Sequence, residues 1–214
     1  MEKENLTKNQ LHRLPDYLSV LKNLDNAGVK SVSCQTIADC LNLNTEKVRK
    51  DIALISSSSG VPNKGRDIKS LIDDIETILG YKQIMNAVLV GVGSLGTAFF
   101  HYKGFEDFGL KIVAGFDTNQ ALIGKNKSLP VYDVKELTKE KVKELDAHIG
   151  IITVPGYAAQ SVADLLVKAE IEGIWNFAPT KLNVPSNVIV SNINLATSLA
   201  VLSYQLYLKE KKEK

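Results

Sequence analysis

Leucines recur at three- and four-residue spacing along the first part of the chain, which is the pattern of an amphipathic helix. The series is Leu11, Leu14, Leu18, Leu21 and Leu24. Thr7 and Gln10 have the spacing of a capping box at the start of this series, and Gly28 is a typical stop at its end. The pattern therefore predicts a first helix that begins near Thr7 and ends before Gly28.

Two shorter apolar stripes follow and predict a helix-turn-helix. One helix covers residues 33–41, and Asn44 can cap the next, which runs through Leu54. The inward positions of the two helices are Ile37, Ala38, Leu41, Val48, Ile52 and Ile55. The segment 56–64 contains four serines, a glycine and a proline, so we expect a loop or a wing-like turn there.

The pattern of apolar positions changes after a fourth predicted helix, which Asp67 can cap and Gly80 can end. Short β-branched runs then alternate with amphipathic segments, which is typical of a parallel sheet with crossover helices. The runs cover residues 87–90, 111–116, 148–154, 173–177 and 188–190, and a last apolar stripe consists of Leu195, Leu199, Leu202 and Leu206. We therefore expect an α/β chain with a winged-helix domain at residues 1–83 and a Rossmann-type domain at residues 84–214.

Composition narrows the class of protein further. The sequence has no apolar run near twenty residues and no basic-then-apolar leader, so we expect a cytoplasmic protein without a membrane span. Its two cysteines, Cys34 and Cys40, lie six residues apart, and we expect them to be reduced, buried small side chains and no part of a disulfide or a metal site. The net charge of +2 is too small to indicate a nucleic-acid partner by itself.

A glycine-rich segment directly follows the predicted strand at residues 87–90 and opens a helix. It reads Gly91, Val92, Gly93, Ser94, Leu95 and Gly96. In the dinucleotide-binding fingerprint the first glycine permits a tight turn, the second lets the backbone approach a pyrophosphate, and the third allows close packing of helix and strand. Asp117 ends the next strand, where the fingerprint places the ribose partner, and no arginine follows it, which favours NAD(H) over NADP(H). The alternative is a glycine-rich turn in a domain without a nucleotide.

Positive residues gather between positions 44 and 69. The predicted DNA-binding residues there are Lys47, Arg49, Lys50, Lys64 and Arg66. Lys47, Arg49 and Lys50 face solvent on the capped helix and can meet phosphates and guanine edges, while the other two can reach an adjacent groove. On charge alone, a solvated helix face is the better interpretation.

Over nearly its full length the chain resembles the Rex family of redox-sensing transcriptional repressors. The matching segments, besides the glycine loop, are Arg13-Leu14-Pro15-Asp16-Tyr17-Leu18, Val48-Arg49-Lys50-Asp51, His101-Tyr102-Lys103-Gly104-Phe105, Phe116-Asp117, Thr153-Val154-Pro155 and Asn176-Phe177-Ala178-Pro179. The resemblance implies a homodimer that binds operator DNA and NADH or NAD+, that releases DNA when NADH binds, and that exchanges the helix from Leu195 between subunits. It also adds Arg13 to the DNA-binding residues. Tyr102 and the segments 153–155 and 176–179 are expected to line the nicotinamide half of the site.

The chain departs from the family pattern at three places. Residues 61–66 replace a glycine-rich wing, Ser19 stands where an arginine of the nicotinamide-sensing network is expected, and Asn194 stands where its aspartate is expected. We therefore expect redox discrimination that is weak, inverted or carried by other groups. An NAD-dependent oxidoreductase is the alternative function, although none of the three histidines is placed as a proton donor and we expect no catalytic residue. A Rex-like protein that has lost or altered its DNA binding is the third interpretation.

Overall fold

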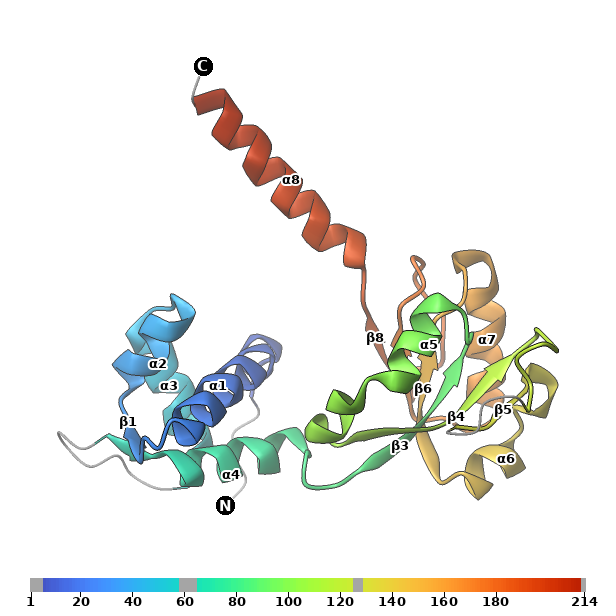
Figure 1. Cartoon of the computed structure of the whole chain (residues 1–214), viewed down its shortest axis with the longest axis horizontal. Helices are drawn as coiled ribbons and strands as arrows, with labels where there is room; N and C mark the ends of the chain where they lie inside the picture. Colours follow the sequence, from blue (N-terminus) through green and yellow to red (C-terminus); the bar gives the residue numbers. More distant parts are fainter. Residues whose placement is uncertain (1–5, 58–64, 125–128, 213–214) are drawn as a thin grey trace. The chain divides into compact units, whose positions relative to one another are not determined.

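The structure, a computed structural model, describes residues 6–57, 65–124 and 129–212. The chain divides into two compact units, Met1–Gln83 and Ile84–Lys214. Figure 1 shows the helices and strands of the two units, and each unit has a hydrophobic core of its own. Within the described ranges, no helix is long and apolar enough to cross a membrane.

The first unit is a small helical bundle with a two-stranded ribbon. Its elements are α1 (Lys8–Asn26), β1 (Ser31–Val32), α2 (Cys34–Leu41), α3 (Thr45–Ile55), β2 (Arg66–Asp67) and α4 (Ile68–Leu79). Thr7, Asn44 and Asp67 cap α1, α3 and α4 as predicted, with a complete capping box of Thr7 and Gln10, and Ser33 caps α2. The tight corner after α2 forms because Asn42 adopts the left-handed conformation. The predicted helix-turn-helix is thus confirmed.

Three details of the first unit differ from the sequence prediction. Leu11 is 40% exposed and lies outside the core, which its four successors in the leucine series reach. Cys34 is only half-buried and Cys40 is exposed, so the prediction of buried thiols is wrong. Cys40 is exposed because α2 turns Ile37 and Ala38 into the core instead. The pairing of β1 with β2 was not predicted, since two-residue strands carry no periodic signal.

The second unit contains a six-stranded sheet. Its elements are β3 (Met85–Val90), α5 (Ser94–His101), η1 (Lys103–Phe108), β4 (Leu110–Asp117), β5 (Val131–Asp133), η2 (Val134–Glu136), α6 (Lys139–Glu144), β6 (Ala147–Ile152), α7 (Gly156–Lys168), β7 (Gly173–Asn176), β8 (Ile189–Asn192) and α8 (Leu195–Lys212). The strand order is β5-β4-β3-β6-β7-β8, and all neighbours pair in parallel. This is the Rossmann order, in which the direction of winding reverses between β3 and β6. The predicted parallel sheet is confirmed, with β5 as an additional short strand.

Alternation along the strands builds one core on each face of the sheet. Val88 and Val90 of β3 belong to the core that side chains of α6 and α7 complete, whereas Ala87 and Leu89 belong to the core that side chains of α5 and η1 complete. With both faces covered, the ligand-accessible part of such a sheet is the edge where the strands end.

The final helix α8 exposes large apolar side chains. They are Leu199, Val201, Leu202, Tyr204, Leu206, Tyr207 and Leu208, while the side chain of Leu195 lies outside what the structure describes. Apolar side chains that are contiguous and exposed commonly mark a surface that another protein covers. The exchange of this helix between subunits stays a prediction.

Candidate functional site

The three glycines of the loop after β3 differ in how closely the rest of the chain approaches them. Gly91 has a φ of +98°, and a Cβ there would lie 2.7 Å from Val154 Cγ1. A Cβ on Gly96 would lie 2.2 Å from the Gly91 carbonyl oxygen, so α5 packs on β3 only because this residue is glycine. A Cβ on Gly93 would meet nothing within 4 Å. The backbone φ of Gly93 is −73°, which any residue can adopt, so neither space nor backbone conformation requires a glycine there. The chain itself therefore requires the first and third glycines, and the open space at the second is suited to a ligand.

Open backbone donors face that space at the start of α5. Gly93 is the N-cap of the helix and supplies no side-chain acceptor, so the N–H groups of the first turn, including those of Ser94 and Leu95, have no capping side chain. Such N–H groups and the positive end of the helix dipole together bind phosphate. The geometry fits a pyrophosphate at the position that the sequence predicts.

Asp117 lies beside the glycine loop at the end of β4. Its Oδ2 accepts a hydrogen bond from Val92 N–H at 2.7 Å, and its Oδ1 accepts from Asn119 N–H at 2.8 Å. A carboxylate has about four lone-pair positions, so both oxygens keep capacity for the hydroxyls of a ribose. The structure thus brings the predicted ribose partner to the predicted pyrophosphate loop.

Thr153 connects the loop after β6 to the glycine loop. Its hydroxyl donates to the Gly91 carbonyl oxygen at 2.7 Å, and its N–H donates to the Val90 carbonyl oxygen at 3.0 Å. Pro155 is the N-cap residue of α7. Thr153, Val154 and Pro155 therefore stand at the carboxyl edge between β3 and β6, where the direction of winding reverses. Open parallel sheets bind ligands at this switch point.

Two predicted nicotinamide residues belong to an aromatic cluster on the α5 face. Tyr102, which is 56% exposed, packs edge to face on Phe105 with ring centres 4.8 Å apart. Phe177 packs on Trp175 at 4.6 Å and on Phe99 at 4.8 Å. The exposed ring of Tyr102 is therefore available to a ligand, while Phe177 mainly supports the cluster.

Asn176 does not present its side chain to the carboxyl edge. It is fully buried, and its amide bonds to the backbone of Ala178 and Thr180 and to the side chain of Asn192. Among the remaining residues of that segment, Ala178 is buried and Pro179 is exposed. In this structure Asn176 therefore shapes the loop, and Pro179 is the member of the segment that a ligand can reach.

The predicted recognition helix α3 presents its positive side chains to solvent. Lys47, Arg49 and Lys50 are all exposed, and Arg49 pairs with Glu46 at 2.7 Å. The carboxylate of Asp51 is buried, so it does not weaken the positive charge of this outer face. The outer face of α3 is thus more basic than the sequence alone indicates.

Arg13 lies on α1 and reaches inward to Asp51 of α3. Its Nε donates to Asp51 Oδ2 at 2.8 Å and its Nη2 to Oδ1 at 3.0 Å, while Tyr17 Oη donates to Oδ2 at 2.7 Å and Gln10 Nε2 to Oδ1 at 3.2 Å. We refer to these four residues as the Asp51 network. In it, Arg13 holds the recognition helix in place, whereas the sequence predicted a contact with DNA.

Burial and hydrogen bonding shift the ionisation of the Asp51 network in opposite directions. Burial by itself raises the pKa of Asp51, but hydrogen bonds from Arg13, Tyr17 and Gln10 outweigh it and hold the pKa below its usual value. Burial and the hydrogen bond to Asp51 raise the pKa of Tyr17 to about 12. The network therefore contains a carboxylate, a guanidinium and a neutral phenol at neutral pH. The spacing of Gln10, Arg13 and Tyr17 places them on the inner face of α1 with the leucines, but it does not identify Asp51 as their partner.

Hydrogen bonds fix the two segments that flank the predicted wing, residues 56–57 and residue 66. Arg66 Nη1 donates to Ser56 Oγ at 2.9 Å, and the buried Asp74 of α4 accepts from the N–H and the hydroxyl of Ser57. Arg66 thus stands beside the C-terminal end of α3. Lys64, the other predicted wing residue, lies outside the described residues.

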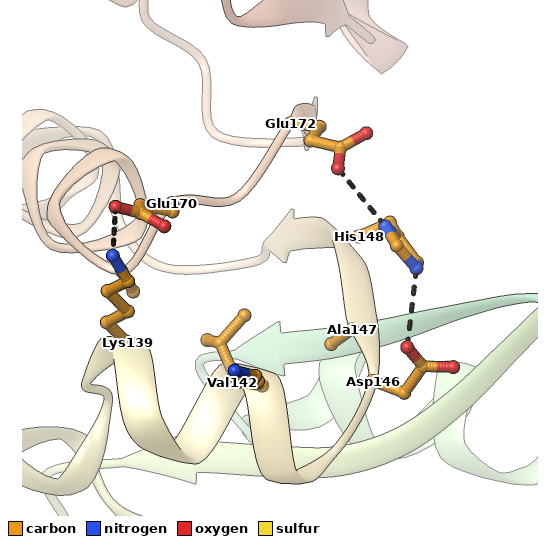
Figure 2. A pocket seen from close by; sticks show the side chains of 9 residues that line it. Lys139, Val142, Asp146, Ala147, His148, Glu170 and Glu172 are labelled. Carbon is orange, nitrogen blue, oxygen red and sulfur yellow. Dashed lines mark hydrogen bonds and ion pairs between the residues drawn. The ribbon is translucent and has the colours of Figure 1, made fainter.

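None of the three histidines belongs to a loop at the carboxyl edge of the sheet. His12 is on α1 in the first unit, and a ring nitrogen of His101 is 2.7 Å from the Thr97 carbonyl oxygen. His148 is the second residue of β6, at the amino edge, in a pocket where it lies between Asp146 at 3.6 Å and Glu172 at 3.3 Å (Figure 2). In the part of the chain that the structure describes, no group of three or more His, Cys, Asp or Glu residues is arranged to hold a metal.

Sequence comparisons match both units. A family profile described as a putative DNA-binding protein N-terminus matches residues 6–53, and one described as a CoA binding domain matches residues 82–180. The redox-sensing transcriptional repressor Rex of Desulforamulus reducens is 42% identical over 200 residues, which cover 93% of this chain and 94% of that protein. The protein of the same name from Treponema denticola is 41% identical over 201 residues, covering 94% and 95%.

Solved structures agree with these relatives over the whole fold. A crystal structure of RSP, a Rex-family repressor, in complex with β-NAD+ and operator DNA has a TM-score of 0.89 at 31% identity and covers 99% of this chain and 97% of that chain. The structure of RSP with β-NADH has a TM-score of 0.86 at 32% identity and covers 99% and 100%.

Proposed function

The chain belongs to the Rex family of redox-sensing transcriptional repressors, and on that premise we propose that it binds operator DNA through residues 1–83 and NAD(H) through residues 84–214. The redox state of the nucleotide then sets the affinity for DNA. The full-length relatives are repressors, so the chain is a regulator and the oxidoreductase alternative is set aside.

The observation that carries this function is the open space at Gly93. Gly91 and Gly96 are required by the chain's own packing, but Gly93 is a position where a side chain would fit and none is present. A pyrophosphate on the N–H groups that begin α5, with its ribose on Asp117, accounts for this choice of residue. The bound dinucleotide would supply the redox signal, and Tyr102, Thr153, Val154, Pro155 and Pro179 would border its nicotinamide.

For DNA, α3 is the element whose shape and charge fit a major groove. The exposed Lys47, Arg49 and Lys50 supply side-chain donors on α3, and Arg66 adds a cation beside the C-terminal end of the helix. The Asp51 network keeps this helix fixed against α1. Arg13 therefore supports DNA binding from behind the helix.

A second copy of the chain is the partner that the exposed apolar side chains of α8 require. Burial of these side chains in a homodimer would present two copies of α3 to a palindromic operator, as symmetric helix-turn-helix proteins do. Because operator DNA is in the cytoplasm of a bacterial cell, we place the protein there.

The test is a measurement of operator affinity with each form of the nucleotide. Fluorescence anisotropy with a palindromic duplex should give tight binding with NAD+ and weaker binding with NADH. Gly93→Ala should fold normally but lose at least tenfold in NADH affinity, whereas the control Gly173→Ala, whose new Cβ would lie 3.8 Å from its nearest neighbour, should bind NADH unchanged. Equal DNA affinity with both nucleotides would contradict the redox response, and unchanged NADH affinity of Gly93→Ala would contradict the site.

A further inference from the structure

Asn176 is the one fully buried polar residue of the second unit that the structure describes. Its Nδ2 donates to the Thr180 carbonyl oxygen and to Asn192 Oδ1, both at 2.8 Å, and its Oδ1 accepts from Ala178 N–H at 3.0 Å. A buried amide with all its bonds made specifies the arrangement of the segments that it joins. Here one side chain joins three segments.

The joined segments lead from the nucleotide edge to the last helix. Asn176 ends β7, and Ala178 and Thr180 belong to the loop that follows it at the carboxyl edge. Asn192 ends β8, the neighbouring strand, and the Asn176 carbonyl oxygen accepts from Ile193 N–H at 2.8 Å. Two residues after Asn192, Asn194 Oδ1 accepts from Ala196 N–H at 3.0 Å in the first turn of α8.

We propose that the hydrogen bond between Asn176 and Asn192 couples the loop at the nucleotide edge to α8, and that it thereby carries the nucleotide's state to the dimer and to DNA. This inference rests on the proposed function of the chain. A ligand that moves the loop must move the carbonyl of Thr180 and the N–H of Ala178, which together orient the amide of Asn176. Since the two ends of an amide are a donor and an acceptor, its reorientation withdraws the donor from Asn192. Asn192 is therefore a positioning residue for α8.

The geometry of Asn192 makes the proposal testable without disturbing the core. Asn192 is exposed at the end of the outermost strand of the sheet, so Asn192→Ala removes the acceptor and opens no buried cavity. Asn192→Asp keeps an oxygen that can accept from Asn176 Nδ2. Ser191→Ala is the matched control, because successive side chains of a strand point to opposite faces.

The quantity to measure is the ratio of the operator dissociation constants with saturating NADH and with saturating NAD+. Asn192→Ala should reduce this ratio about fivefold, the effect of one neutral hydrogen bond, with NADH affinity nearly unchanged. Asn192→Asp and Ser191→Ala should keep the ratio of the unchanged chain. A purely structural role would lower stability and leave the ratio alone.

Two outcomes are distinguishable failures. If the unchanged chain has a large ratio and Asn192→Ala keeps it, the coupling inference is wrong while the redox response stands. If the unchanged chain binds DNA equally with both nucleotides, the redox response is wrong and the coupling inference fails with it.

Discussion

Replacing Arg13 by glutamine should destabilise the first unit without removing a contact to DNA. The guanidinium donates twice to Asp51, whose side chain is only 3% exposed, while the Arg13 side chain is 23% exposed. Removing one member of a buried ion pair costs about 3–5 kcal/mol, because the other charge stays buried. Tyr17 and Gln10 still donate to the carboxylate, so we expect about 3 kcal/mol. For a unit of this size the loss lowers the melting temperature by roughly 10–20 °C.

The matched variant is Lys50→Gln, which removes a positive charge from the exposed face of α3. Its effect on stability should stay within about 0.5 kcal/mol, as is usual for an exposed position. Each lysine or arginine that contacts a phosphate contributes about 0.9 to the slope of log affinity against log salt concentration. Lys50→Gln should therefore reduce that slope by about one, and Arg13→Gln should leave it unchanged.

Urea unfolding and salt-dependent DNA binding of the same variants distinguish the two roles. The double variant Arg13→Gln, Asp51→Asn should recover most of the stability that either single change loses, because no buried charge is then left unpaired. The reasoning is refuted if Arg13→Gln lowers the salt slope by about one at unchanged stability, since Arg13 would then contact a phosphate. If the double variant lost as much free energy of unfolding as the two single variants together, the coupling of Arg13 to Asp51 would be refuted.

Three further predictions concern the nucleotide, pH and assembly. Asp117→Ser should raise the affinity for NADPH relative to NADH at least tenfold in calorimetric titration, because the carboxylate that repels a 2′-phosphate is gone; an unchanged ratio would contradict the assignment. The pKa of Asp51 is lowered by its donors, so the stability it contributes is present above about pH 4 and is lost as the pH falls through its folded value. Urea midpoints of Asp51→Asn should accordingly depend less on pH below about pH 4 than those of the unchanged chain. Leu202→Glu with Leu206→Glu should convert a dimer to a monomer in light scattering, because charges would then lie in the face that a partner covers.

Local patterns in the sequence were sufficient for the elements and for the nucleotide loop. Thr7, Asn44 and Asp67 cap helices, and Gly80 ends one, because capping depends on groups only a few residues apart. The same holds for the loop from Gly91 to Gly96, where spacing along the chain sets the geometry. Short strands such as β1, β2 and β5 were missed because they exist only through pairing with distant segments.

The role of individual polar side chains depended on contacts between distant segments. Arg13 and Asp51 are 38 residues apart, and only the tertiary fold brings the two side chains together, so a basic residue of a matching motif could not be distinguished from a DNA contact. Asn176 likewise stands in a segment expected beside the nicotinamide, and the pairing of β7 with β8 is what buries its amide.

The sequence by itself determined the order of helices and strands, the glycine loop with its carboxylate, and the basic face of α3, since each depends on residue spacing within one or two elements. Only the tertiary structure decided that Arg13 supports the recognition helix from inside, that Asp51 is not exposed on the basic face, and that Asn176 links the nucleotide edge to α8. The reason is physical: a polar side chain takes the partner that folding brings within about 3 Å, and that partner can lie anywhere along the chain.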